Sequence, residues 1–221
     1  MILILLNLLE IVFSNYRFYF NKLFIQTMTT LTDQLNELIS SRRSTKPRLF
    51  NGCKIDDKIV WQILENANWA PNHGLTQPWR YKVFASTGLN KLAEFQADLY
   101  QKITPEQKFK LEKYERMKSN ILKSSHVIAI CMERQKSEKI LEIEEVEAVA
   151  CSVQNMALTA AAYNICSFWG SGGVTYTDEL KEFLNLSKKD KCLGYLYLGY
   201  SDNPTTKSRR EPIANKVEWI V

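Results

Sequence analysis

The sequence has few residues that could act as metal ligands or nucleophiles. Only two of its 221 residues are histidines, His73 and His126, which leaves little for a zinc site or a serine triad. Its five cysteines are scattered, odd in number and never spaced Cys-x-x-Cys. This pattern favours reduced thiols over disulfides or zinc and predicts a cytoplasmic protein. The sequence also lacks the Gly-x-Gly-x-x-Gly and P-loop motifs that bind phosphates.

Glycine and proline are scarce as well, with eight and six residues, so collagen-like repeats and low-complexity linkers do not describe this chain. Hydrophobic residues make up 45% and charged residues 24%, a composition that can bury a core and that excludes a disordered chain. At this length we expect one domain. The net charge of +5 is weak for a dedicated nucleic-acid binder, although it suits a protein that holds a phosphorylated ligand.

The first 27 residues are rich in apolar residues and lack the regularly spaced polar residues of the rest of the chain. They have no basic region before the apolar run and no small-residue cleavage site, which argues against a secretory signal. Asn7, Glu10 and Arg17 interrupt the run, which argues against a membrane span of about 18 residues. The remaining hypothesis is that Met28 is the natural start and that residues 1–27 are an upstream extension or a loosely attached amphipathic segment. We therefore expect residues 28–221 to form the folded domain and residues 1–27 to be dispensable.

Helical and strand patterns interleave along residues 28–221, without the regular βαβ rhythm of a Rossmann sheet. Thr32 or Asp33 can cap the first helix, Pro71 ends the second, and Thr104 and Gln107 have the spacing of a capping box. The patterns predict helices over residues 31–41, 56–70, 89–100, 104–118, 143–164 and 177–184, and strands over residues 79–85, 127–132, 167–170 and 193–200.

The helix predicted over residues 143–164 is unusual because it has no charged residue between Ala148 and Tyr163. Two adjacent stripes of this helix consist of apolar or small residues. A helix without a polar face is expected to be buried all round. This stretch is short for a membrane span, so we expect it inside a globular core or at a subunit interface.

Two basic groups lie near the ends of the domain. Arg42, Arg43 and Ser44 follow the first helix, and the segment 207–210, Lys-Ser-Arg-Arg, lies near the C-terminus. One interpretation is a solvated helix end, where cations complement the helix dipole. The other is a phosphate clamp, because guanidinium groups and hydroxyls match phosphate oxygens. The two groups could converge on one phosphate.

Two further segments have the composition of ligand-binding loops. The loop from Trp69 to Trp79 places Asn72, His73, Thr76 and Gln77 between two tryptophans. It is either a turn with packing tryptophans or a loop that bonds the polar edge of a heteroaromatic ring. The segment 168–173, Phe-Trp-Gly-Ser-Gly-Gly, ends a predicted strand with three glycines, which would let backbone N–H groups approach a ligand closely.

Taken together, these motifs resemble the FMN-dependent nitroreductase family, and in particular its short NAD(P)H nitroreductases. The resemblance covers Leu31 to Arg210. It rests on the Arg-Arg-Ser start at residues 42–44, the Ala-Pro-x-His-x-x-x-Gln-Pro-Trp loop at 70–79, and the Trp-x-Ser-Gly turn at 169–172 after the long uncharged helix. It also includes Leu-Tyr-Leu-Gly at 196–199, which precedes Lys207 and Arg209.

The resemblance implies an α+β fold with a central, mostly antiparallel sheet flanked by helices, and an interlocked homodimer with FMN at the interface. By carry-over, the expected FMN ligands are Arg42, Arg43 and Ser44 at the phosphate and ribityl chain, Lys207 and Arg209 at the phosphate or ring, Trp169, Gly170 and Ser171 against the isoalloxazine, and Trp69, His73 and Gln77 from the polar loop. Of the loop residues, Trp69 and His73 would face the flavin from the partner subunit. Residues 159–164 match a stretch assigned to the nicotinamide nucleotide in these relatives.

The implied reaction passes a hydride from NADH or NADPH to flavin N5 and then, in a ping-pong sequence, to a nitroaromatic, a quinone or a similar small acceptor. No side chain is expected to be catalytic, and no metal, membrane or nucleic acid is expected to take part. Trp69 and Gly170 stand where these relatives can carry arginine, so two cationic flavin contacts are expected to be missing. Two alternatives remain: a basic nucleic-acid-binding module without flavin, and a flavoenzyme of the same fold with another acceptor, such as an enone.

Overall fold

The computed structural model describes residues 30–221, and the chain divides into two units between Ser40 and Ser41. The expectations about residues 1–27 and about Met28 as the start lie outside the described residues. Helix α2 (Leu31–Ser41) makes up most of the described part of the first unit and ends at Ser41, the first residue of the second; its bounds agree with the predicted helix. Its N-cap is Thr30, not Thr32 or Asp33, because Thr30 and Asp33 form a reciprocal capping box.

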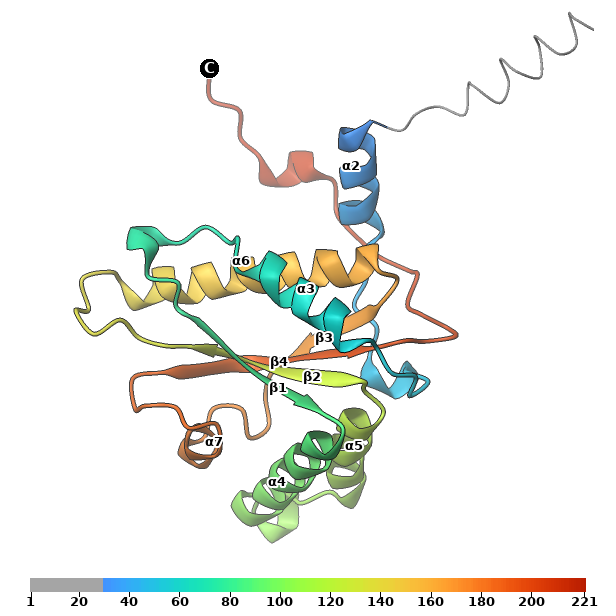
Figure 1. Cartoon of the computed structure of the whole chain (residues 1–221), viewed down its shortest axis with the longest axis vertical. Coiled ribbons are helices and arrows are strands. Elements are labelled where there is room, and N and C mark those ends of the chain that lie inside the picture. The colour runs from blue at the N-terminus through green and yellow to red at the C-terminus, as the bar shows by residue number, and fades with distance from the viewer. Residues whose placement is uncertain (1–29) are drawn as a thin grey trace, which may run out of the picture. The chain divides into compact units, whose positions relative to one another are not determined.

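The second unit is built on a four-stranded antiparallel sheet with the order β1-β2-β4-β3 (Figure 1). The strands are β1 (Trp79–Ala85), β2 (His126–Met132), β3 (Cys166–Gly170) and β4 (Lys191–Gly199). Every residue of β2 is buried, as its continuous apolar run predicts. The prediction of an α+β fold with an antiparallel sheet is confirmed.

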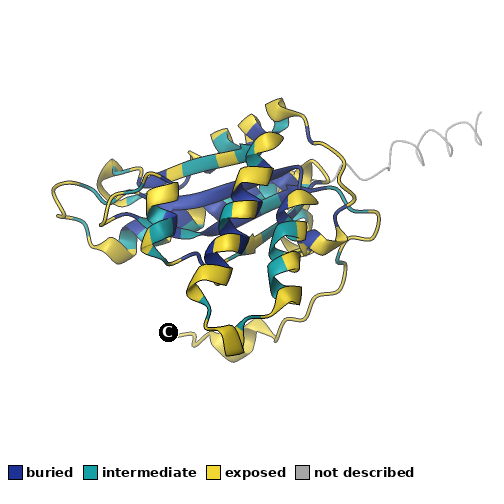
Figure 2. Ribbon diagram, turned by 90° about the horizontal axis from the view of Figure 1, so that it is seen from below, coloured by how far each residue is buried: buried dark blue, intermediate teal, exposed yellow. Residues whose placement is uncertain are grey.

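Helices cover both faces of the sheet (Figure 1). On one face α3 (Asp57–Ala67) and α6 (Glu142–Ala162) pack against Ile128 and Ile130 of β2 and their neighbours on β4. On the other face α4 (Thr87–Ile103), α5 (Leu111–Leu122) and α7 (Asp178–Phe183) cover Val127, Ala129 and Cys131. Alternate residues of β2 therefore enter two separate cores, which is the side-chain period of a strand. Figure 2 shows buried residues, in dark blue, concentrated in the sheet and on the inner sides of the helices.

The prediction of a helix starting at Thr104 was wrong. Thr104 is the C-cap of α4 and has extended backbone angles, because the residue before a proline avoids the α region and Pro105 follows. A short 3₁₀ turn at Glu106–Lys108 comes next, and α5 begins only at Leu111. The other short 3₁₀ turns are Pro47–Leu49, His73–Leu75 and Ile213–Lys216.

Helix α6 is only partly buried within the single chain, so the core accounts for one face of the stretch that was expected in a core or at a subunit interface. Ala148, Ser152 and Met156 face the core, whereas Cys151, Gln154 and Ala162 are exposed. The exposed face is small and uncharged from Cys151 to the end of the helix. Among the described residues, no helix is both long and apolar enough to cross a membrane.

Candidate functional site

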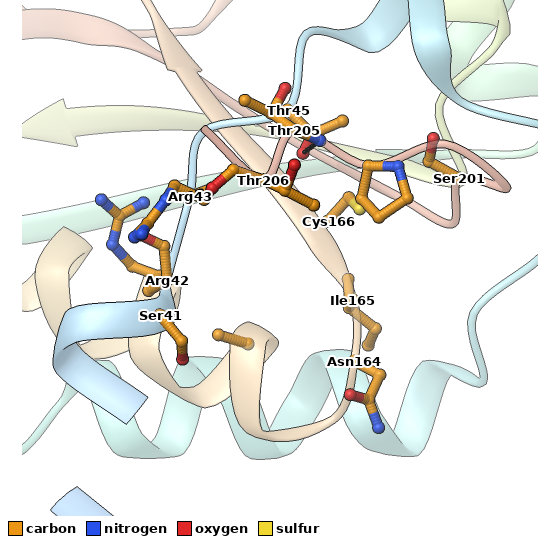
Figure 3. A pocket seen from close by; sticks show the side chains of 12 residues that line it. Ser41, Arg42, Arg43, Thr45, Asn164, Ile165, Cys166, Ser201, Thr205 and Thr206 are labelled. Atoms are coloured by element: carbon orange, nitrogen blue, oxygen red, sulfur yellow. Dashed lines mark hydrogen bonds between the residues drawn. The ribbon is translucent and has the colours of Figure 1, made fainter. Parts of the chain in front are cut away.

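A cavity of about 590 Å³ opens where three segments of the second unit meet (Figure 3). The first segment is the chain that follows α2, the second joins α6 to β3, and the third follows β4. Each of them contributes polar groups. The lining residues are Ser41, Arg42, Arg43, Thr45, Ala161, Asn164, Ile165, Cys166, Ser201, Pro204, Thr205 and Thr206. We call this cavity the arginine pocket.

Hydrogen bonds from backbone amides hold these segments together. Ser44 forms an isolated parallel bridge with Ser167 of β3, and the Thr45 amide donates to the Ser167 carbonyl over 3.0 Å. The Thr205 amide then donates to the Thr45 hydroxyl over 3.1 Å. The segment of residues 42–45 thus lies between β3 and the C-terminal segment. This arrangement fixes the backbone from which the side chains of Arg42 and Arg43 extend.

The donor set of the arginine pocket suits an anion. Arg42 and Arg43 supply two guanidinium groups, and several lining residues supply hydroxyls (Figure 3). Nε of Arg43 donates to the Thr206 carbonyl over 3.1 Å, which ties this side chain to the C-terminal segment. None of the described lining residues is acidic. Such a set matches the oxygens of a phosphate.

Cys166 is the one thiol in this lining, and it is half-buried. Burial raises the pKa of the Cys166 thiol, and a hydrogen bond with Thr45 partly opposes that shift. The thiol is therefore largely protonated at neutral pH, which makes it a packing group more than a nucleophile.

A second cavity of about 360 Å³ lies at the other end of β3. Val146 and Ala150 of α6 form one wall, and Trp169 with Ser171 forms another. Tyr176 and Leu193 complete the lining, so the cavity is mainly apolar and aromatic. We call it the Trp169 pocket.

Trp169 is anchored at this second site. Its indole Nε1 donates to the Leu193 carbonyl over 3.1 Å, and the side chain keeps 40% of its surface exposed. Gly194 explains the close approach of the two strands here, since a Cβ at this position would lie 2.5 Å from the Gly170 carbonyl oxygen. The turn after β3 therefore packs on β4 with no room for a side chain at residue 194.

The two cavities share α6 and β3. Ala150 lines one and Ala161 lines the other, and eleven residues of α-helix rise about 16 Å. A ligand that bridged them would thus be extended, with an anionic group at one end and an apolar, aromatic group at the other.

The structure brings together only some of the residues predicted for the site. Arg42 and Arg43 line the arginine pocket, and Trp169 and Ser171 line the Trp169 pocket. Four others are not part of the linings. Ser44, Gly170 and Lys207 are each adjacent in sequence to a lining residue, and Arg209 comes three residues after Thr206. Lys207 and Arg209 are exposed.

The polar loop, residues 69–79, lies away from both cavities and contacts the start of α6. His73 pairs with Glu144 in the first turn of α6, where Nδ1 and Oε2 are 2.7 Å apart. Within the same loop, the Asn72 side chain accepts a hydrogen bond from the Gln77 amide over 2.9 Å, and Trp69 is almost fully exposed. Trp69, His73 and Gln77 therefore line neither cavity of their own chain.

Sequence patterns missed several lining residues. Thr205 and Thr206 directly precede the basic segment 207–210, so a pair of hydroxyls beside basic residues was an available signal. Cys166 reaches the arginine pocket through the pairing of β3 with residues 44–45. Ala161 and Asn164 also line this pocket, and they belong to the stretch 159–164 that the resemblance matches to the nicotinamide nucleotide. No local pattern marks Tyr176 or Leu193.

Comparisons with known proteins identify the family of this chain. The model of a family described as the nitroreductase family matches residues 39–200. "Putative NAD(P)H nitroreductase YfhC" of Bacillus subtilis (strain 168) is 26% identical over 183 residues, which make up 82% of this chain and 92% of that protein. The crystal structure of a nitroreductase-like family protein from Bacillus cereus matches with a TM-score of 0.74 at 26% identity, covering 84% of this chain and 95% of that one.

A further solved structure shares the fold. It is the FMN-dependent nitroreductase NfnB from Mycobacterium smegmatis in complex with NADPH, with a TM-score of 0.69. At 17% identity the match covers 86% of this chain and all of that one.

Proposed function

Because the chain belongs to the nitroreductase family, we propose that it is an FMN-dependent oxidoreductase that takes a hydride from NADH or NADPH and passes it to a small acceptor, such as a nitroaromatic or a quinone. The observation that carries this proposal is the arginine pocket, whose donor set suits a phosphate. The NAD(P)H nitroreductase name of the Bacillus subtilis relative supports the same reaction class.

The proposed phosphate ligands are Arg42 and Arg43, with hydroxyls from Thr45, Thr205 and Thr206 around them. A charge-assisted hydrogen bond contributes about 1.5–3 kcal/mol. Micromolar affinity corresponds to about 8 kcal/mol. Three or four such contacts, together with burial of a ring, are therefore enough to hold FMN. Lys207 follows Thr206 and is proposed to reach the same phosphate, as is Arg209.

The Trp169 pocket is the proposed site of the isoalloxazine ring. Its apolar lining and its separation of about 16 Å along α6 from the arginine pocket suit a cofactor that carries its phosphate and its ring at opposite ends. When bound, FMN supplies the hydride chemistry through its ring. The role of the protein is to orient the ring against Trp169 and Ser171 and to exclude water from it.

We also propose a homodimer in which the polar loop completes the site of the partner. Trp69 and His73 line neither cavity of their own chain, and His73 pairs with Glu144 in the first turn of α6. The exposed face of α6 is uncharged from Cys151 to Ala162, which suits close packing against a second copy. In such a dimer each FMN would contact both chains. Size-exclusion chromatography with light scattering tests this, since a particle of one chain's mass would contradict it.

The test of the function is the purified full chain. We expect it to be yellow, to release FMN on denaturation, and to oxidise NADH or NADPH in the presence of an acceptor. A panel of nitroaromatics, quinones and enones would then identify the acceptor class. A colourless protein that cannot be reconstituted with FMN would overturn the proposal. If the same protein bound DNA or RNA with a steep salt dependence, the alternative of a basic nucleic-acid-binding module would replace it.

A further inference from the structure

Two buried thiols face each other across the centre of the sheet. Cys131 on β2 is opposite Cys192 on β4 in the antiparallel register. Their residues are 0% and 4% exposed, and both side chains belong to the core formed with α4 and α7. Neither cysteine lines the arginine pocket or the Trp169 pocket, so the proposed function gives them no role.

The backbone geometry is compatible with a covalent bond between these thiols. Opposed residues of antiparallel strands have Cα atoms about 4.5–5.5 Å apart. A disulfide joins Cα atoms about 4.4–6.8 Å apart. The register shifts between Ile130 and Cys131, so that Leu193 has no partner on β2. Such a bulge bends the strand locally and gives it room to adjust.

The two thiols already interact. Sγ of Cys192 lies 3.7 Å from the Gly194 carbonyl oxygen, to which the thiol donates. The neighbouring Cys192 thiol, followed by burial, raises the pKa of Cys131, while the neighbouring Cys131 thiol lowers the pKa of Cys192. Cys192 is therefore the better nucleophile of the two.

The other three cysteines have different surroundings. Cys53 and Cys151 are exposed, and Cys166 is half-buried beside Thr45. All five cysteines lie in the part of the chain that the structure describes. The opposed pair on β2 and β4 is thus the place in the described residues where the sheet register sets two cysteines against each other.

We propose that Cys131 and Cys192 form a redox modification site, at which hydrogen peroxide converts the two opposed thiols into a reversible cross-strand disulfide. The Cys192 thiolate attacks one peroxide oxygen, so that an S–O bond forms and the O–O bond breaks. This step gives a sulfenic acid and one molecule of water once protonation is complete. The Cys131 sulfur then attacks the sulfenic sulfur, so that the S–S bond forms, the S–O bond breaks and a second water leaves. The thiols lose two electrons in total, and peroxide gains them.

Formation of the disulfide would change the geometry of the Trp169 pocket. Gly194, two residues after Cys192, has a φ of +118° and packs against the Gly170 carbonyl and the Trp169 indole. Bonded sulfurs are only about 2.0 Å apart, so closure draws Cys192 toward β2. The backbone next to Gly194 then shifts relative to the turn of residues 169–171. This inference concerns the chain's own thiols and stands whether or not FMN is the cofactor.

Peptide mapping of the full-length protein tests the proposal. The exposed thiols are first blocked under native conditions with N-ethylmaleimide, and the protein is then treated with hydrogen peroxide. After denaturation without reductant, the remaining thiols are labelled with iodoacetamide and the digest is analysed by mass spectrometry. We expect a peptide pair joined through Cys131 and Cys192, two hydrogen atoms lighter than the reduced pair. Dithiothreitol should restore both peptides.

Two variants serve as matched controls. Cys166→Ala removes a cysteine outside the pair, and it should leave the yield of the joined peptides unchanged. Cys131→Ala removes the partner thiol, so Cys192 should accumulate as sulfinic or sulfonic acid instead of a disulfide. If Cys131→Ala does not fold, the mapping of the parent protein still decides the question. The proposal is overturned if peroxide leaves both thiols free for iodoacetamide, oxidises them separately, or joins either one to another cysteine.

Discussion

Nδ1 of His73 lies 2.7 Å from Oε2 of Glu144, and this pair joins the polar loop to the first turn of α6. The loop needs such a tether because it contains residues with positive φ, namely Gly74, Leu75 and Gln77. Left-handed backbone conformations are costly for the two non-glycine residues, so surrounding contacts must maintain them. The pairing with Glu144 therefore adds to the hydrogen bond between the Gln77 amide and the Asn72 side chain in holding the loop.

Replacing Glu144 with alanine should loosen the polar loop with little effect on global stability. Both side chains are partly exposed, and exposed ion pairs contribute about 0.2–1 kcal/mol. We expect faster hydrogen exchange at the amides of residues 73–77 and a change in unfolding free energy below about 1 kcal/mol. Glu142→Ala is the control. Glu142 lies on the same turn of α6 as Glu144, but it pairs with Lys191 of β4 and not with the polar loop. Equal exchange rates in the two variants would contradict the tether.

Arg42→Ala should weaken FMN binding. Loss of one charge-assisted hydrogen bond, at about 1.5–3 kcal/mol, corresponds to a roughly 10- to 150-fold rise in Kd. Titration of apoprotein with FMN, followed by quenching of flavin fluorescence, measures this. Arg48→Ala provides the comparison, since Arg48 is exposed in the neighbouring 3₁₀ turn and does not line the arginine pocket. A Kd for Arg42→Ala equal to that of Arg48→Ala would place the phosphate elsewhere.

Gly194→Ala should destabilise the fold more than Gly172→Ala. Both glycines have positive φ, +118° and +113°, so each alanine introduces backbone strain of about 1–3 kcal/mol. Only at Gly194 does the new Cβ also meet a backbone atom, the Gly170 oxygen at 2.5 Å, whereas nothing lies within 4 Å at Gly172. Overpacking adds about 1–3 kcal/mol. Urea unfolding of both variants measures the difference, and equal losses would show that strain alone matters.

His126 should make stability fall with acid below neutral pH. Burial lowers the pKa of His126, and a hydrogen bond and charge interaction with Asp57 partly oppose this shift. Below about pH 6.5 the unfolded chain therefore binds a proton that the native state resists, so the unfolding free energy decreases as pH falls toward 5. The loss is complete once pH passes below the native pKa.

His126→Gln should flatten this pH dependence, because the unfolded chain then gains no extra proton at residue 126. Asp57→Asn should steepen it, because the carboxylate that favours the imidazolium is gone. Urea unfolding at several values between pH 5 and 7 gives the slopes. Identical slopes for the parent and His126→Gln would show that other groups control the acid response.

Much of the fold follows from local sequence patterns. The bounds of β1 and α2 agree with the predicted residues because each segment has a clear period and clear stop signals. The predicted start of α5 was wrong because it relied on a capping-box spacing at Thr104. Pro105 instead holds Thr104 in an extended backbone conformation, and the helix begins at Leu111. Which face of α6 is exposed could not be predicted, because two adjacent stripes of this helix both consist of apolar or small residues.

The candidate site was predictable only in part. Arg42 and Arg43 stand out in the sequence as a basic pair, and they do line a cavity. Thr45 and Cys166 join it through the bridge between Ser44 and Ser167, a long-range contact that no periodicity encodes. The place of His73 beside Glu144 likewise depends on tertiary packing between the loop and α6.

Helix α6 lines both cavities, and this limits where the chain can accept insertions. Their separation is determined by the rise of α6 and the length of β3, not by loops. Insertions in surface loops such as 133–141 leave that separation unaltered. A single residue inserted between Ala150 and Ala161 would instead turn one end of α6 by about 100° relative to the other. The two cavities could then no longer both be lined by α6. Homologous proteins should therefore vary in loop length but keep the number of residues between the positions of Ala150 and Ala161 constant.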